Sequence, residues 1–334
     1  MDELGLLEKL VACRSTSGQE GDYARLAAEV LRELGFQAEL REVAPGRPNV
    51  VARDGSTKLR VVFSTHLDTV PPHIPPTRKG DRLEGRGACD AKGPFVSMVE
   101  AARRLKEKGA TGIGFLLLVS EEVDHLGALV AGRDYQDLAK DQPRILLGEP
   151  TCAKVVLAQK GLLKVALRAH GKAGHSAFPD RGVSAVHGLL DALEKIRKEP
   201  WPTDPELGPT TINVGTIAGG VAANVFAPAA EAVLVFRLVS PWKPVLDRVR
   251  ELCQGVEVEA ASQNDPVRFK VPAGEPTSLV PFNTDATYIA PLGPVWLGGP
   301  GAIEVAHSVD EHTTKDELAA GTDLYLRLAE RALA

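Results

Sequence analysis

The order of helix and strand patterns changes twice along the chain, and this constrains the fold more than any other feature. Up to about residue 160, helical patterns alternate with apolar strand patterns such as VVFSTH, GFLLLVSEE and RILLGEP. From Gly161 to about residue 271 the order becomes strand, helix, strand, strand, helix, strand, and after residue 272 the alternation resumes. Alternating elements are typical of a parallel sheet, whereas βαββαβ is a split-βαβ unit.

We therefore predict two domains, one inserted into the other. Residues 1–160 and 272–334 are expected to form an α/β domain, with a mostly parallel sheet and helices on both faces. Residues 161–271 are expected to form an inserted βαββαβ (ferredoxin-like) domain. The 334 residues, of which 44% are hydrophobic, are enough for two cores. Helical spacing over residues 20–34, ended by Gly35, and a last helix from Lys315 complete the expected elements.

Charge and composition exclude several classes of partner. A net charge of −5 without any block of Lys or Arg argues against nucleic acid. The N-terminal MDELGLLEKLVACRS is an acidic amphipathic pattern without a basic start or a long apolar run, so we expect no signal peptide and no membrane span. The four cysteines form no CxxC pair, which favours reduced thiols and a cytoplasmic location; they are Cys13, Cys89, Cys152 and Cys253.

Histidine and acidic residues follow several of the predicted strands. The set comprises His66, Asp68, Asp90, Glu121, Glu122, Glu149 and His307. Because the carboxyl ends of parallel strands meet at one edge of a sheet, these side chains are expected to lie together. Neighbouring carboxylates repel each other unless a cation neutralises them, and imidazole with carboxylate suits a divalent ion. The sequence therefore predicts a divalent-metal site.

Six short segments carry a resemblance to a known family. In chain order they are HLDTVP, GRGACDAKG, EE, GEPT, GHSAFP and AHSVDEH. Together they resemble the two-zinc exopeptidase and deacylase family that contains acetylornithine deacetylase, succinyl-diaminopimelate desuccinylase, aminoacylase and carboxypeptidase G. Single segments such as EE occur in many proteins, but six in register over nearly the whole chain are specific.

The resemblance implies two divalent metal ions, with zinc expected and cobalt or manganese as alternatives. It assigns His66, Asp90 and Glu149 to one ion. It assigns Asp90, Glu122 and His307 to the other, so that Asp90 bridges the pair. Each ion then has one imidazole and one carboxylate of its own, with a water between the two ions.

Further roles near the metals also come from the resemblance. Glu121 is the expected general base, which takes a proton from the water between the metals and passes it to the leaving nitrogen. This requires SEE to lie on a turn, because adjacent side chains on a strand point to opposite faces. Asp68 is expected to accept the second ring N–H of His66 and so orient that ligand. A cis peptide bond is expected between Asp90 and Ala91.

The inserted domain is implied to act as a lid and as the interface of a homodimer. His175 is expected to reach the neighbouring subunit's site and stabilise the oxyanion. Four residues match substrate-contacting positions of the family: Asn224, Arg237, Asn283 and Thr284. Arg237 is the expected partner of the substrate α-carboxylate, although Val235 stands where many relatives carry an Asp.

The implied activity is removal of an N-acyl group from an amino acid. The segments GEPT, LAQKG and DAKGP most resemble the branch of acetylornithine and acyl-lysine deacetylases, which act in amino-acid biosynthesis. Within enzymes, the alternatives are a di- or tripeptidase and the desuccinylase. A catalytically idle, ligand-binding relative or a regulatory dimer is the alternative outside enzymes, and the presence of Glu121 with all expected ligands argues against it. The expected substrate is a small N-acyl amino acid or a short peptide.

Overall fold

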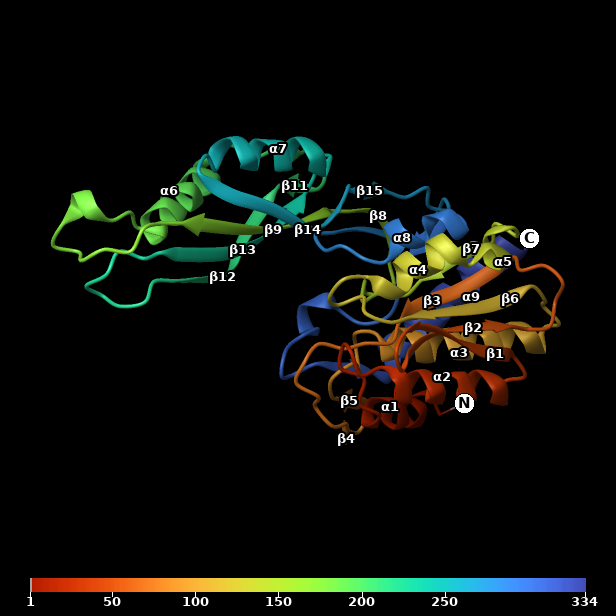
Figure 1. Cartoon of the computed structure of the whole chain (residues 1–334). Helices are drawn as coiled ribbons and strands as arrows, with labels where there is room; N and C mark the ends of the chain where they lie inside the picture. The colour runs from red at the N-terminus through yellow and green to blue at the C-terminus, as the bar shows by residue number, and fades with distance from the viewer. Residues whose placement is uncertain (1) are drawn as a thin grey trace. The chain divides into compact units, whose positions relative to one another are not determined.

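The computed structural model describes residues 2–334, which divide into two compact units (Figure 1). Unit 1 contains the chain up to Leu157, Phe269–Ser278 and Thr284–Ala334. Unit 2 contains Ala158–Arg268 and Leu279–Asn283. A small sheet at the points where the chain passes from one unit to the other is formed by β8 (Val155–Gln159), β15 (Val267–Arg268) and β16 (Thr277–Val280).

Unit 1 is built on a six-stranded sheet with the order β1-β2-β6-β3-β7-β17. Its strands are β1 (Gln37–Ala44), β2 (Arg47–Arg53), β3 (Val61–His66), β6 (Ile113–Leu118), β7 (Arg144–Leu147) and β17 (Val295–Leu297). Strands β6, β3, β7 and β17 run parallel, which confirms the predicted mostly parallel sheet. The antiparallel hairpin β1–β2 adds to one edge. Its first strand, QAELREVA, has no apolar run, so no strand was predicted there.

Helices cover both faces of this sheet, as predicted. The longer ones are α1 (Glu3–Ala12), α2 (Gly21–Glu33), α3 (Lys92–Glu107) and α9 (Lys315–Leu333), and the shorter ones are α4 (Leu126–Asp134), α5 (Gln136–Ala139) and α8 (Ala286–Ile289). Figure 1 shows α2 and α3 on one side of the sheet and α4 with α8 on the other. Helix α2 ends before Gly35, whose φ of 78° ends the turn, and α9 begins with a capping box between Thr314 and Glu317.

A second sheet in unit 1 joins two segments that are distant in sequence. It consists of β4 (Thr77–Lys79), β5 (Arg82–Glu84) and β18 (His312–Thr314), with β5 in the centre. Strand β5 is followed by the loop that carries Asp90, and β18 is preceded by the loop that carries His307. Their pairing therefore brings these two loops to the same part of the unit. The 3₁₀ helices η2 (Ala290–Leu292) and η3 (Ile303–Val305) lie in the connections around β17.

Unit 2 has the predicted βαββαβ order. Its main elements are β9 (Gly161–His170), α6 (Ala185–Lys198), β12 (Thr211–Gly219), β13 (Ala229–Leu238), α7 (Trp242–Leu252) and β14 (Val256–Asn264). The sheet order β12-β13-β9-β14 is fully antiparallel. Alternate residues of β9 are buried with the apolar faces of α6 and α7 in a separate core. The short η1 (Pro179–Arg181), β10 (Thr203–Asp204) and β11 (Gly208–Pro209) lie in its loops.

The structure also bears on two predictions about the chain as a whole, which concern membrane-spanning helices and the state of the cysteines. Within residues 2–334, no helix has both the length and the apolar character needed to cross a bilayer. The four cysteines are all free thiols, in agreement with the absence of a CxxC pair. Cys89 and Cys253 are buried, whereas Cys152 is exposed.

Candidate metal centre and active site

Three parallel strands end at the same edge of the sheet in unit 1 and carry candidate residues there. His66 is the last residue of β3 and pairs in register with Leu118, the last residue of β6. The two glutamates Glu121 and Glu122 follow β6 after a short turn, and Glu149 follows β7. The polar side chains therefore begin where the buried apolar runs stop, as the sequence predicted.

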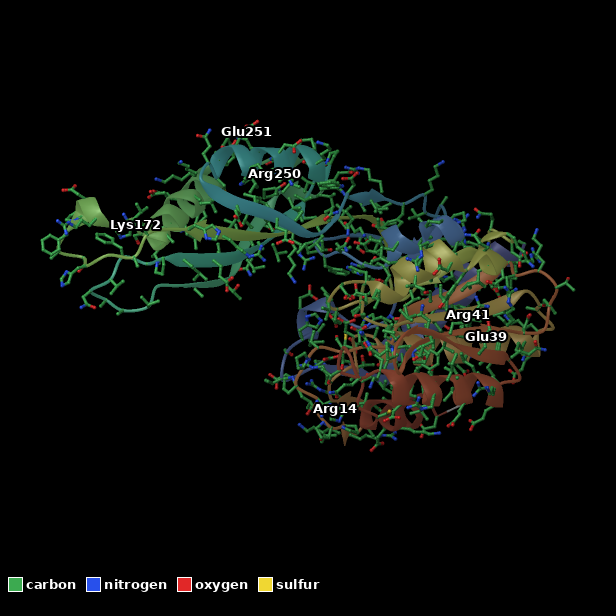
Figure 2. All side chains as sticks on the ribbon, viewed as in Figure 1. Arg14, Glu39, Arg41, Lys172, Arg250 and Glu251 are labelled. Atoms are coloured by element: carbon green, nitrogen blue, oxygen red, sulfur yellow. The ribbon has the colours of Figure 1, made fainter. Side chains whose placement is uncertain are left out.

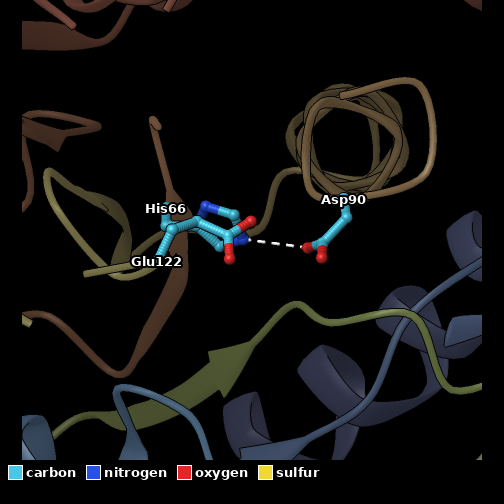
Figure 3. A group of neighbouring side chains, drawn as sticks. All are labelled: His66, Asp90 and Glu122. Carbon is cyan, nitrogen blue, oxygen red and sulfur yellow. Dashed lines mark hydrogen bonds and ion pairs between the residues drawn. The ribbon is translucent and has the colours of Figure 1, made fainter. Parts of the chain in front are cut away.

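Asp90 lies between two imidazoles. The peptide bond from Asp90 to Ala91 is cis, as expected from the resemblance, and α3 begins directly after it. Asp90 Oδ1 lies 3.0 Å from His66 Nε2, an interaction drawn as the dashed line in Figure 3, and Oδ2 lies 3.2 Å from His307 Nε2. Each carboxylate oxygen thus faces a different histidine, which is the arrangement required of a ligand shared by two cations.

Two further carboxylates complete the group. Glu122 Oε1 lies 2.9 Å from His307 Nε2, and one ligand atom from each of His66, Asp90 and Glu122 falls within 4.8 Å of the others (Figure 3). Glu149 is buried, and its Oε1 has no hydrogen-bond partner among the described residues. A buried carboxylate oxygen without a donor is costly, and a cation would satisfy it. The donor set therefore fits divalent metal ions.

The charges of the site also fit a divalent cation. Burial raises the pKa of Glu149 well above its ordinary value, and the neighbouring carboxylates raise it further. Hydrogen bonds with Asp90 and Glu122 raise the pKa of His307 to about 10. Burial alone would raise the pKa of Asp90, but hydrogen bonds from His307 and His66 hold it below its ordinary range. A cation bound by these residues would compete with the protons on their imidazole and carboxyl groups.

A tight turn presents the two glutamates. Ser120 has a φ of 70°, and its carbonyl oxygen accepts the backbone N–H of His125 at 2.7 Å. Asp68 fixes the same turn from outside, because its Oδ1 accepts the Glu121 N–H at 3.0 Å and its Oδ2 accepts the Glu122 N–H at 3.2 Å. The SEE segment therefore lies on a turn, as predicted, and both glutamates begin from one anchored point.

Asp68 contacts His66 mainly through its main-chain carbonyl oxygen. The His66 Nδ1 lies 2.9 Å from the main-chain carbonyl oxygen of Asp68, whereas the nearer carboxylate oxygen is 3.5 Å away. The carboxylate already accepts hydrogen bonds from the 121–122 turn and from the Ser17 hydroxyl at 2.7 Å. Because a carbonyl oxygen can only accept, Nδ1 carries the proton and Nε2 is left to bind a metal.

Comparison with known proteins agrees with this geometry. Residues 62–331 match the family model described as peptidase family M20/M25/M40. The chain belongs to this family. It is 33% identical to a "Probable carboxypeptidase" of Talaromyces marneffei, over 98% of this chain and 85% of that protein.

Solved structures share the fold of this M20 chain. A tripeptidase from Staphylococcus aureus matches with a TM-score of 0.82 and 19% identity, over 99% of this chain and 98% of that one. An M20 family metallo-carboxypeptidase from Sulfolobus solfataricus matches with a TM-score of 0.78 and 19% identity, over 100% and 99%. Family membership makes the chain a metal-dependent hydrolase that acts on amide bonds.

Sequence reasoning did not assign two polar groups of the M20 site. The first group is His125 and Asp285, whose Nδ1 and Oδ1 lie 2.8 Å apart; His125 Nδ1 also lies 3.9 Å from Oε1 of Glu121, the expected base. The second group is the buried pair of Arg86 and Glu311. Two of the segments quoted for the resemblance contain Arg86 and Glu311, namely GRGACDAKG and AHSVDEH. Asp285 directly follows Thr284, and His125 is four positions after Glu121.

The other predicted residues are distributed over both units. Thr284, in unit 1, is fully buried, and its hydroxyl accepts the Ala286 N–H at 3.2 Å. In unit 2, Asn283 Oδ1 accepts a hydrogen bond from Gln159 at 3.3 Å. Arg237 lies half-buried on β13. The substrate-binding roles of these residues remain predictions.

The loops that carry His175 and Asn224 pair with each other in unit 2. Ser176 N–H donates to the Asn224 carbonyl oxygen at 3.0 Å, and His175 forms an isolated bridge with Val225. The His175 ring is exposed, and its Nδ1 accepts the Ala177 N–H at 3.1 Å. The structure thus brings these two predicted residues together, whereas the candidate metal ligands all belong to unit 1.

Proposed function

We propose that the chain is a two-metal hydrolase that removes an N-acyl group from an amino acid. The observation that supports this best is the Asp90 carboxylate, which has a separate imidazole at each oxygen. His66 and Glu149 would complete one ligand set, and Glu122 and His307 the other. When bound, the ions polarise the amide carbonyl and lower the pKa of water. Zinc is the expected ion by ligand type, with cobalt or manganese as alternatives.

Glu121 would act as the general base of this reaction. It shares the turn with Glu122 but is not needed in either ligand set. Burial raises the pKa of its carboxyl group well above the usual range, which suits a group that accepts a proton from water and donates it to the leaving nitrogen. Asp68 would hold the turn, and Arg237 would bind the substrate α-carboxylate.

The second candidate function is a carboxypeptidase or di- or tripeptidase. It is favoured by the names of the similar proteins, among them a carboxypeptidase and a tripeptidase. The deacylase and a dipeptidase both cleave an amide whose nitrogen belongs to an amino acid with a free α-carboxylate. They differ only on the acyl side, which is a simple acid in one case and an amino acid with a free amine in the other.

Paired substrates separate these two functions. The protein, loaded with Zn²⁺, would be given N-acetyl amino acids and alanyl dipeptides that share the same C-terminal residue, ornithine, lysine and glutamate included. A deacylase should give the higher kcat/KM on the acetyl member of each pair. A preference for the dipeptides would establish the peptidase instead, and hydrolysis of neither series by the metal-loaded protein would contradict the proposed class of substrate.

We also propose that unit 2 forms a homodimer and supplies His175 to the partner's site. Strand β12 supports this proposal, because it is at one end of the sheet order and has β13 as its only neighbouring strand among the described residues. Its side chains are largely exposed, Ile217 by 54%. A long edge strand with exposed apolar side chains readily pairs with a second chain.

A further inference from the structure

Glu311 binds the backbone of the loop that carries Asp90. It lies four residues after His307 in the chain, and its side chain is fully buried. A single oxygen, Oε1, accepts three backbone N–H groups: those of Gly87 at 2.9 Å, Cys89 at 3.1 Å and Asp90 at 3.0 Å. The bridging candidate is therefore held at its own peptide nitrogen by a residue from the segment that carries His307.

Arg86 extends this contact to two more segments. Its Nη1 donates to Glu311 Oε2 at 2.6 Å and to the Ser308 carbonyl oxygen at 3.1 Å, and its Nε donates to the Pro72 carbonyl oxygen at 3.3 Å. Ser308 is the neighbour of His307, and Pro72 lies in the loop that follows His66. The buried Arg86 guanidinium, 2% exposed, thus joins the loops that carry three of the five metal-ligand candidates, namely His66, Asp90 and His307.

The pair has a charge pattern suited to this place. A buried carboxylate close to Asp90 would add repulsion to a cluster that already has excess negative charge. Here the negative charge of Glu311 is offset by Arg86, and both of its oxygens accept hydrogen bonds. The pair therefore fixes the loop from Gly87 to Asp90 without adding net charge to the site.

We propose that Glu311 and Arg86 are positioning residues that hold Asp90 ready to bridge two cations and so set the metal affinity. This inference rests on the proposed metal centre. The reason is preorganisation: with its backbone fixed, the Asp90 carboxylate keeps one oxygen toward His66 and the other toward His307. If the loop moved freely, part of the binding free energy would be lost in ordering it.

The test is the affinity of Glu311→Gln for Zn²⁺, measured against a competing chelator. The amide keeps the size of the side chain but loses its charge, and in either orientation its NH2 donor faces another donor, either the three N–H groups or Arg86. We expect the affinity to fall by about 10- to 100-fold, as for residues that orient metal ligands. With Co²⁺, the visible absorption spectrum of the variant should differ from that of the wild-type protein, because the bridging ligand is less well ordered.

Glu275→Gln is the matched control. Glu275 is a comparably buried carboxylate of unit 1, with a 2% exposed side chain that pairs with Arg327 at 3.2 Å and Arg331 at 3.3 Å. Its variant removes a buried charge away from the candidate ligands and should bind Zn²⁺ and Co²⁺ as the wild type does. An equal loss in both variants would show a general effect of destabilisation and would overturn the positioning role.

Arg86→Lys keeps the inference testable if Glu311→Gln does not fold. Lysine retains the charge near Glu311 but lacks the planar fork that also reaches Ser308 and Pro72, so a loss of Zn²⁺ affinity of about 10-fold is expected. A folded Arg86→Lys protein with wild-type affinity would overturn the inference. A wild-type protein that bound no divalent ion would contradict the proposed function. A wild-type protein that bound Zn²⁺ as tightly as both variants would contradict only the positioning role.

Discussion

Different backbone features position the side chains of the candidate metal centre. His66 stands at the end of a buried strand, and its ring is turned by the carbonyl oxygen of Asp68. Asp90 is held in a loop at its own N–H by Glu311. Glu121 is presented by a turn that the Asp68 carboxylate anchors. The chemistry of each residue therefore depends on hydrogen bonds made by backbone atoms, and these bonds are what a substitution nearby would disturb.

The base assignment predicts how Glu121→Ala behaves. Because Glu121 would move protons and bind no metal, the variant should keep its metal ions and nearly unchanged KM, while kcat falls by a factor of about 10² to 10⁴. Metal content by elemental analysis and steady-state kinetics on the best substrate of the panel would measure both quantities.

Glu122→Ala is the natural comparison because it removes the adjacent carboxylate of the same turn. Its loss should lower metal content together with activity, since Glu122 Oε1 approaches His307 and belongs to the compact ligand group. If metal were lost from the Glu121 variant and retained by the Glu122 variant, the two roles would have to be exchanged.

At the scale of elements, charged contacts attach the hairpin β1–β2 to the short helix α5. Asp137 of α5 accepts hydrogen bonds from Arg41 of β1 at 2.8 Å and from Arg53 of β2 at 2.9 Å. Figure 2 labels Arg41 beside Glu39, with which it also forms an ion pair on β1. Since β1 has few buried side chains, these contacts matter more to the edge of the sheet than they would to a central strand.

The Asp137 contacts predict a pH-dependent contribution to stability. Hydrogen bonds from Arg41 lower the pKa of Asp137 to about 2, so its contribution is fully present above the ordinary carboxyl pKa and is lost as the pH falls toward 2. Asp137→Asn should lower the free energy of unfolding by about 1 kcal/mol or less at neutral pH, since the group is 41% exposed and screened. The difference from wild type, followed by thermal unfolding, should shrink between about pH 4 and pH 2.

Asp134→Asn provides the control for this measurement. Asp134 pairs only with its neighbour Arg133 among the ion pairs of the described residues, and both side chains are well exposed. Its replacement should change the unfolding temperature little at any pH. A pH-independent loss of stability in Asp137→Asn would show that the ionised carboxylate is not what holds the hairpin.

At the scale of the whole molecule, the proposed dimer predicts complementation between inactive variants. Glu121→Ala and His175→Ala homodimers should both be nearly inactive. In a hybrid, the subunit with His175→Ala keeps Glu121 and would receive an intact His175 from its partner, so one of the two sites works. After random exchange of equal amounts, half of the dimers are hybrids, and activity should recover to roughly a quarter of wild type.

Mixing Glu121→Ala with Glu122→Ala is the control for complementation. Both residues would serve the site of their own subunit, so no hybrid contains an intact site and activity should stay low. Differently tagged chains would verify that exchange has occurred. Verified hybrids of the Glu121 and His175 variants without recovered hydrolysis would rule out a role of His175 in the partner's site.

The sequence by itself determined the elements and much of the candidate site. The 3.6-residue and two-residue periodicities are local, and they predicted α2, β3 and the βαββαβ order of unit 2. Because parallel strands end at one edge, the polar residues after them, such as His66 and Glu149, could be expected to lie together. The resemblance added the shared role of Asp90, which stays a prediction, and the cis bond that the structure contains; the turn at Ser120 followed from the need for both glutamates to face one site.

Tertiary structure alone decided which atoms meet. The outer strand β1 has no apolar run; it exists because β2 pairs it with the rest of the sheet and Arg41 attaches it to α5. Glu311 and Gly87 are separated by 224 positions, and no local pattern encodes a hydrogen bond over that distance. His66 contacts the carbonyl oxygen of Asp68 rather than its carboxylate because the carboxylate accepts hydrogen bonds from Ser17 and from the turn at Glu121. Periodicity is a property of neighbours in sequence, whereas the choice of hydrogen-bond partner is settled only when distant segments pack together.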